Sequence, residues 1–182
     1  MAIRMNEIRK YDLESVSIRL VKDATVFKTY RHLDCPGKIV DTLYDFVSEL
    51  DREVCMVINL DTKGKPINYN LVSIGTLDSS LVAPREVLKS GILSNAASLV
   101  LLHQHPSGDP TPSRQDDEIT ERMKYACGLI GIRLLDHIIL GEPWDNYFSY
   151  CENERILSDK MTNYNIQRKF DEMIRKEREQ TL

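Results

Sequence analysis

Apolar and polar residues are distributed between positions 36 and 157 in a way that predicts helices and strands in turn. Apolar side chains recur at helical spacing from Pro36 to about Leu50, and Pro84 suits the first turn of a second helix. A third helix is expected from Ser113 to about Cys127. Short apolar runs predict a hairpin of two strands at 54–60 and 67–75, further strands at 97–102 and 133–140, and allow one more at 146–150. We therefore expect an α/β domain with a mixed β-sheet flanked by helices.

Two segments flank this domain. Residues 1–35 form an N-terminal extension in which Ser15–Val21 alternates polar and apolar side chains, as in a half-buried strand. Residues 158–182 form a charged tail, and 159–179 is expected to be a helix with a thin apolar stripe. Such a stripe packs more often on its own domain than on a partner. The chain is therefore expected to divide into an extension, one domain at 36–157 and a charged C-terminal helix.

Composition and charge narrow the class of protein. Of the 182 residues 42% are apolar, yet no stretch approaches the length of a membrane span, so we expect a cytoplasmic chain without a membrane partner. Residues 36–157 hold eleven Lys and Arg against eighteen Asp and Glu, which makes direct nucleic-acid binding doubtful because it needs basic surface. The four cysteines are scattered without a CxxC pair, so we expect free thiols and no paired-cysteine zinc ribbon.

One segment, LLHQHPSGDPTPSRQDD at 101–117, carries the candidate chemistry. His103 and His105 are two apart, and residues i and i+2 of a strand project to the same face. Asp116 follows after a proline-stiffened loop, at a helix start that can hold it beside them. Two neutral imidazoles and one carboxylate leave a fourth tetrahedral position for water, as in a catalytic zinc site. A chain of this length and composition is expected to contain about 0.09 His-x-His patterns by chance. The pairing therefore favours a shared metal over two structural histidines.

Ser113 and Asp116 have a second interpretation. Ser-x-x-Asp at the start of a helix also fits a capping box, in which the two side chains bond to backbone N–H groups and no metal is needed. Taken alone, the pair favours this cap. The two interpretations are compatible, because a cap can orient a ligand.

HQHPSG at 103–108, together with Ser113 and Asp116, resembles the JAMM motif of Jab1/MPN-type metalloproteases. The surrounding sequence resembles the bacterial RadC branch of that family, and the similarity extends from about residue 53 to residue 151. It includes GTLDSS at 75–80, PREV at 84–87 and LLDHIILG at 134–141. This resemblance implies a deaminase-like JAB/MPN fold with a mixed sheet flanked by helices.

The resemblance also implies a role for individual residues. It assigns the zinc ligands to His103, His105 and Asp116, the catalytic glutamate to Glu53, and the serine that assists the transition state to Ser113. The implied function is a zinc-dependent hydrolase of amide bonds, a metallopeptidase or isopeptidase, with a protein or peptide substrate. Glu53 is chosen by the resemblance alone, because nothing except its location singles it out among thirteen glutamates.

Other functions are weighed against this one. A non-catalytic MPN-type interaction module in DNA repair or mobile-element biology is expected to have an incomplete ligand set, whereas the set here is complete. A zinc nucleobase deaminase needs H-x-E followed by P-C-x-x-C, and neither pattern occurs. Residues 1–35 are too short for the helix-hairpin-helix domain usual in RadC proteins, so the chain resembles a short form, and homo-oligomer formation is left open. His137, in an apolar strand, is expected to have a structural role or to support the ligands.

Overall fold

The computed structural model of the chain describes residues 17–21, 23, 29, 32–49, 53–74, 82–143 and 145–156. This part of the chain contains the helices α1 (Pro36–Ser48), α2 (Pro84–Leu93) and α3 (Arg114–Ile130). It also contains the strands β1 (Val54–Leu60), β2 (Pro66–Ile74), β3 (Ser98–Gln104), β4 (Arg133–Leu140) and β5 (Tyr147–Ser149). The helices and strands predicted between 36 and 157 are thus confirmed, with small differences at their ends.

The five strands form one mixed sheet in the order β2-β1-β3-β4-β5. β1 pairs antiparallel with β2 and with β3, which confirms the predicted hairpin. β3 and β4 are parallel, and α3 makes the crossover that a parallel pair requires. β5 adds an antiparallel edge to β4. The predicted mixed α/β architecture is confirmed.

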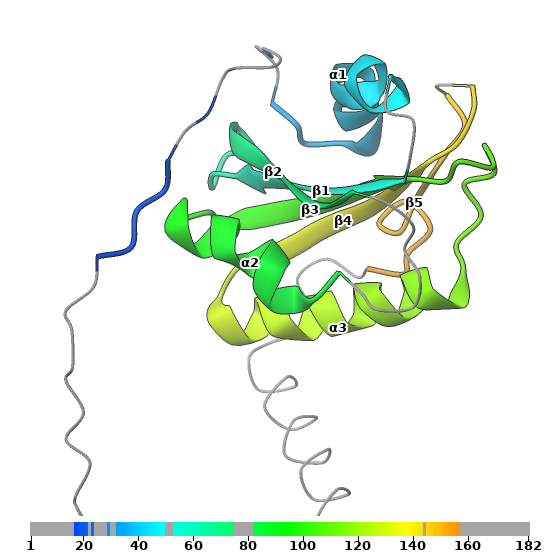
Figure 1. Ribbon diagram of the computed structural model, residues 1–182. Helices are drawn as coiled ribbons and strands as arrows, with labels where there is room; N and C mark the ends of the chain where they lie inside the picture. The colour runs from blue at the N-terminus through cyan, green and yellow to red at the C-terminus, as the bar shows by residue number, and fades with distance from the viewer. Residues whose placement is uncertain are drawn as a thin grey trace, which may run out of the picture.

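The sheet separates two layers of helix and therefore two cores. α1 covers one face, and α2 and α3 cover the other (Figure 1). Side chains of β1 alternate between them: Met56 and Ile58 pack in the core on the α1 side, whereas Cys55 and Val57 pack on the side of α2 and α3. Central strands buried on both faces carry near-continuous apolar sequence, which is why β1 and β3 read as apolar runs.

The strand predicted at Ser15–Val21 is wrong for the residues described there. Residues 17–21 form no strand, and Ile18 is 75% and Val21 80% exposed. An alternating pattern builds a strand only when a neighbouring strand and an apolar surface meet it, and none of the five described strands pairs with this segment. The tail helix predicted at 159–179 lies outside the described residues.

Two expectations from composition can also be compared with the structure. The four cysteines are free thiols, with Cys55 and Cys127 buried and Cys35 and Cys151 exposed. Among the described residues, no helix combines the length and the apolar character needed to cross a membrane. The cysteine prediction is therefore confirmed.

Candidate metal centre

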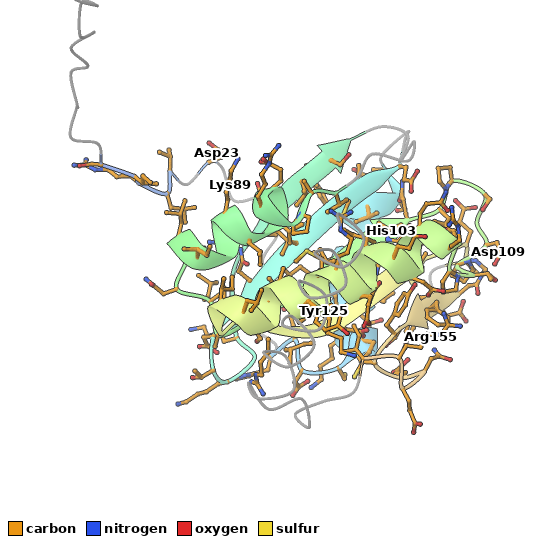
Figure 2. The ribbon with its side chains drawn as sticks, turned by 90° about the horizontal axis from the view of Figure 1, so that it is seen from below. Asp23, Lys89, His103, Asp109, Tyr125 and Arg155 are labelled. Carbon is orange, nitrogen blue, oxygen red and sulfur yellow. The ribbon has the colours of Figure 1, made fainter. Side chains whose placement is uncertain are left out.

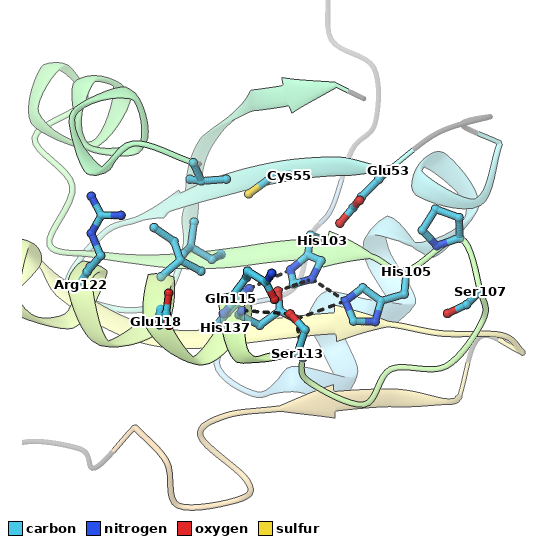
Figure 3. A pocket seen from close by; sticks show the side chains of 15 residues that line it. Glu53, Cys55, His103, His105, Ser107, Ser113, Gln115, Glu118, Arg122 and His137 are labelled. Carbon is cyan, nitrogen blue, oxygen red and sulfur yellow. Dashed lines mark hydrogen bonds and ion pairs between the residues drawn. The ribbon is translucent and has the colours of Figure 1, made fainter. Parts of the chain in front are cut away.

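Three segments that are distant in sequence meet where β3 ends and where β1 and α3 begin. β1 and β3 run antiparallel with Cys55 opposite His103, so the residue two before Cys55 projects to the same side of the sheet. That residue is Glu53. α3 lies across this side of the sheet, with His103 near its first turns (Figure 2). In the close view, Glu53, His103, His105 and Ser113 surround a common space (Figure 3).

Asp116 contacts both imidazoles of the predicted motif. Its Oδ1 lies 3.1 Å from Nε2 of His103, and its Oδ2 lies 3.4 Å from Nε2 of His105. The two Nε2 atoms are themselves 3.0 Å apart. Asp116 is 4% and His103 is 2% exposed, so these contacts are shielded from water. The structure therefore brings three potential ligand side chains together at the end of β3.

Ser113 and Asp116 form the capping box that was the alternative interpretation. The backbone N–H of Asp116 donates to Ser113 Oγ at 3.2 Å, and the backbone N–H of Ser113 donates to Asp116 Oδ2 at 2.7 Å. The Ser113 hydroxyl donates to the same Oδ2 at 2.6 Å. The cap therefore uses Oδ2 most heavily and leaves Oδ1 directed at His103. One carboxylate serves the helix start and faces the histidines at the same time.

The loop after β3 orients His105. The Nδ1 atom of His105 lies 2.8 Å from the backbone carbonyl oxygen of Asp109. A carbonyl oxygen only accepts, so Nδ1 carries the proton and a neutral His105 presents its lone pair on Nε2. The Asp109 side chain accepts from the backbone N–H and the hydroxyl of Thr111, which holds this loop. A metal-binding histidine is commonly oriented in this way, with its second nitrogen bonded to a carbonyl.

Asp116 carries a negative charge beside the two imidazoles. Burial raises the pKa of its carboxyl, but the imidazoles of His103 and His105 and the Ser113 hydroxyl beside it outweigh burial and hold this pKa below its ordinary value. The Asp116 carboxylate raises the pKa of His105 against the effect of burial, because it stabilises the protonated ring. Burial raises the pKa of the Cys55 thiol, which borders the same space, to about 12.

Glu53 approaches the histidines from the start of β1. A carboxylate oxygen of Glu53 and one nitrogen each of His103 and His105 all lie within 4.8 Å of one another. These three residues are therefore an alternative ligand set. The contacts of 3.1 and 3.4 Å belong to Asp116, however, and the spacing of Glu53 also suits contact through one water. Asp116 therefore makes the direct contacts with the two imidazoles, and Glu53 lies beside them.

The separations among the potential ligand atoms fit a metal ion of the size of zinc. Zn–N bonds of about 2.0–2.1 Å at tetrahedral angles place neighbouring ligand atoms about 3.3–3.4 Å apart. The two Nε2 atoms are 3.0 Å apart, and each lies 3.1 or 3.4 Å from one of the two Asp116 oxygens, Oδ1 for His103 and Oδ2 for His105. Two imidazoles and a carboxylate are also a ligand set found in catalytic zinc sites. The residues present therefore fit a metal with one open position.

A cavity of about 370 Å³ opens beside these residues. It passes from His105 and Ser107 at one end, along the surface of α3, to Glu118 and Arg122 at the other (Figure 3). Its apolar lining comes from Val82, Leu101 and Ile119. A space of this volume is in the range of small-molecule sites.

A comparison with known families accounts for this arrangement. The model of the RadC-like JAB domain matches residues 33–156. The chain belongs to this family. The match covers all the described helices and strands and every residue of the metal centre. The RadC-like resemblance inferred from the motif is thus confirmed.

Relatives of this RadC-like chain that are named UPF0758 protein align with about two thirds of it. The relative from Rubrobacter xylanophilus is 47% identical over 121 residues, which are 66% of this chain and 52% of the relative. A relative from Desulforamulus reducens is 43% identical over 123 residues, 68% of this chain and 53% of the relative. A relative from Clostridium perfringens is 44% identical over 122 residues, 67% and 52% of the two chains. The chain spans about half the length of the curated relatives it matches.

The RadC-like site contains every residue that the sequence analysis selected, and two more lie behind His103. Nε2 of His137 lies 2.8 Å from Nδ1 of His103, and Oγ1 of Thr120 lies 2.5 Å from Nδ1 of His137. His137 was expected to be structural or to support the ligands, whereas Thr120 was missed. A signal for Thr120 was present, because it follows Asp116 by four residues and so shares its face of α3.

Proposed function

We propose that this RadC-like domain is a zinc-dependent hydrolase of amide bonds, a metallopeptidase or isopeptidase that acts on a protein or peptide substrate. One observation carries the proposal: the ligand atoms of His103, His105 and Asp116 converge at 3.0–3.4 Å. They do so beside a cavity, with the Glu53 carboxylate close to both imidazoles. Such a convergence supports a metal with an open position, which is the arrangement that hydrolysis needs.

Glu53 is proposed as the general base and acid. When bound, the zinc ion would lower the pKa of a water molecule and polarise the substrate carbonyl. Glu53 would accept the proton of this water as the water oxygen attacks the carbonyl carbon, and would then return the proton to the leaving amine. Its place at the start of β1, on the side to which the imidazoles project, suits this transfer.

Ser113 is proposed to stabilise the oxyanion that forms on the substrate. In the structure its hydroxyl donates to Oδ2 of Asp116, so the side chain has to turn that proton toward the substrate. The backbone N–H of Ser113 continues to donate to Oδ2 during this movement, which keeps the start of α3 capped. Ser113→Ala should lower turnover by about 100- to 1000-fold, the usual effect of removing one oxyanion donor.

The decisive experiment compares two glutamate-to-glutamine variants in the same cavity. Glu53→Gln should keep about one zinc per chain by elemental analysis and lose hydrolysis, because the base is not a ligand. Glu118→Gln is the matched control, since Glu118 lines the cavity but pairs with Arg114 on the exposed side of α3. A proteome extract is then incubated with each protein. Wild type and Glu118→Gln should create new N-termini or remove branched peptides, whereas Glu53→Gln should do neither.

Three results would contradict the proposal in different ways. Gently purified protein without stoichiometric transition metal would argue against any metalloenzyme. Loss of zinc in Glu53→Gln would make Glu53 a ligand, as in the alternative set with the two histidines. Full zinc content without any turnover would favour the non-catalytic interaction module, in DNA repair or mobile-element biology.

A further inference from the structure

Behind His103 a series of hydrogen bonds leads back to Asp116. Nδ1 of His103 lies 2.8 Å from Nε2 of His137 on β4, and Nδ1 of His137 lies 2.5 Å from Oγ1 of Thr120 on α3. Oγ1 of Thr120 lies 2.5 Å from the backbone carbonyl oxygen of Asp116. Because Oδ1 of Asp116 contacts Nε2 of His103, the contacts close a ring. None of the four residues is more than 4% exposed.

The donors and acceptors in this ring can be assigned from chemistry alone. A carbonyl oxygen only accepts, so the one hydroxyl proton of Thr120 goes to Asp116. Thr120 Oγ1 must then accept from Nδ1–H of His137, and a neutral His137 has its lone pair on Nε2. Nδ1–H of His103 donates to that lone pair, which leaves Nε2 of His103 without a proton.

As long as the Thr120 hydroxyl donates to the Asp116 carbonyl, the opposite assignment requires a buried cation. If Nε2–H of His103 donated to Asp116, Nδ1 of His103 would have to accept a proton from Nε2 of His137. Since His137 already donates from Nδ1, it would then carry two protons and a positive charge. His137 is 1% exposed and its ring stacks on Tyr150 with centroids 5.0 Å apart. The burial of this ring strongly disfavours that charge.

We infer that His137 and Thr120 are positioning residues, which set the tautomer of His103 so that its Nε2 lone pair faces the metal position. The inference rests on the proposed function only in taking this position as a zinc site. His105 is oriented independently by Asp109. Both imidazoles then present lone pairs beside the Asp116 carboxylate, with no proton between the three groups. A metal cation satisfies such a set, and groups that orient the ligands in this way raise affinity for it.

The first test reads the tautomer directly from ¹⁵N shifts and long-range ¹H–¹⁵N couplings in the full chain freed of zinc. Wild type should show His103 protonated at Nδ1. Thr120→Val keeps the shape of the side chain and removes the hydroxyl, so His103 should become a mixture of tautomers. Thr120→Ser keeps the hydroxyl and should match wild type. A wild-type His103 protonated at Nε2 would overturn the inference.

The second test measures zinc affinity by competition with a chelator. Thr120→Val and His137→Leu should bind zinc about 10- to 100-fold more weakly, the usual effect of removing a group that orients a ligand. His137→Gln should recover part of the loss, because its amide oxygen can accept from His103. Thr42→Val is the matched control. The Thr42 hydroxyl also donates to the backbone carbonyl four residues earlier, that of Lys38, but it lies in α1, on the other face of the sheet. Affinities for Thr120→Val and His137→Leu equal to that of Thr42→Val would overturn the inference.

Neither test needs turnover, so its failure differs from failure of the proposed function. Zinc binding with the expected order of variants but without hydrolysis would remove the proposed activity and support the positioning role. If the protein hydrolyses its substrate but neither Thr120→Val nor His137→Leu changes its zinc affinity, the activity is supported and the positioning role is overturned.

Discussion

Asp116→Asn separates the capping role that the structure shows for this carboxylate from the zinc-binding role proposed for it. Oδ2 of Asp116 accepts from the backbone N–H and the hydroxyl of Ser113, whereas Oδ1 lies 3.1 Å from Nε2 of His103. Asparagine has one oxygen and one NH₂ group, and the two donors of Ser113 hold the oxygen at the Oδ2 position. The NH₂ group therefore takes the Oδ1 position and points its protons at the metal site.

The change is expected to be mild for folding and severe for zinc binding. The cap keeps its hydrogen bonds, so the free energy of unfolding of the zinc-free chain should fall by less than the ~1 kcal/mol that a whole cap contributes. Zinc loses its anionic ligand and meets a donor in its place. Affinity should therefore fall by more than about 100-fold, the upper end for a residue that only orients a ligand, which corresponds to about 2.7 kcal/mol.

A competition titration of zinc against a chelator measures this effect, and urea unfolding of the zinc-free proteins measures the cap. Ser113→Ala is the control, because it removes a cap hydroxyl and no ligand. It should bind zinc far more tightly than Asp116→Asn. Wild-type affinity in Asp116→Asn would refute the reasoning, since Ser113 and Asp116 would then be an ordinary cap and two histidines would remain, too few for a catalytic site.

Three further predictions concern other parts of the chain. Gly141→Ala should lower the free energy of unfolding in urea by about 1–3 kcal/mol, because a Cβ there would lie 2.5 Å from the carbonyl oxygen of Gly108; an unchanged midpoint would contradict this. Burial raises the pKa of Asp136 from 3.8 to about 6. Between pH 3.8 and about 6 the Asp136 carboxyl therefore holds more of its proton in the folded protein than in the unfolded chain. Its contribution lowers the free energy of unfolding by up to about 3 kcal/mol as pH rises through this range. Asp136→Asn should remove that slope from urea unfolding at pH values between about 4 and 7, and equal slopes for the two proteins would argue against it. DNA binding should be weak and salt-sensitive in mobility-shift assays, given eleven basic against eighteen acidic residues over 36–157; tight sequence-specific binding at physiological salt would count against this expectation.

The secondary structure between 36 and 157 was predictable because each element carries its own signal. Pro36 and Pro84 mark the helix starts, and the central strands are apolar throughout because both of their faces are covered. Residues 17–21 show the limit of this reasoning. Their alternating pattern is as regular as that of a strand, but a pattern within one segment does not say whether a partner strand lies beside it.

The site divides in the same way into local and long-range parts. The spacing of His103 and His105 and the helix start that holds Asp116 are local features, so the sequence alone indicated that they lie close together. The place of Glu53 depends on which residue of β1 stands opposite His103, and no single segment contains that information. Thr120 meets His137 only because α3 packs on β4. Resemblance to a family supplied Glu53, and only the three-dimensional structure supplied Thr120.

The pairing of β1 with β3 makes apolar packing responsible for where the proposed base stands. Met56 and Ile58 are buried only while they face α1, and a slip of one residue would turn both of them to the opposite side. The same slip would turn Glu53 away from His103. The core beneath α1 lies on the opposite face of the sheet from the site. Its packing nevertheless fixes the distance between Glu53 and the two imidazoles, across which the proposed base would act. Substitutions that loosen this core are a route by which reactivity is lost while every residue of the site is still present.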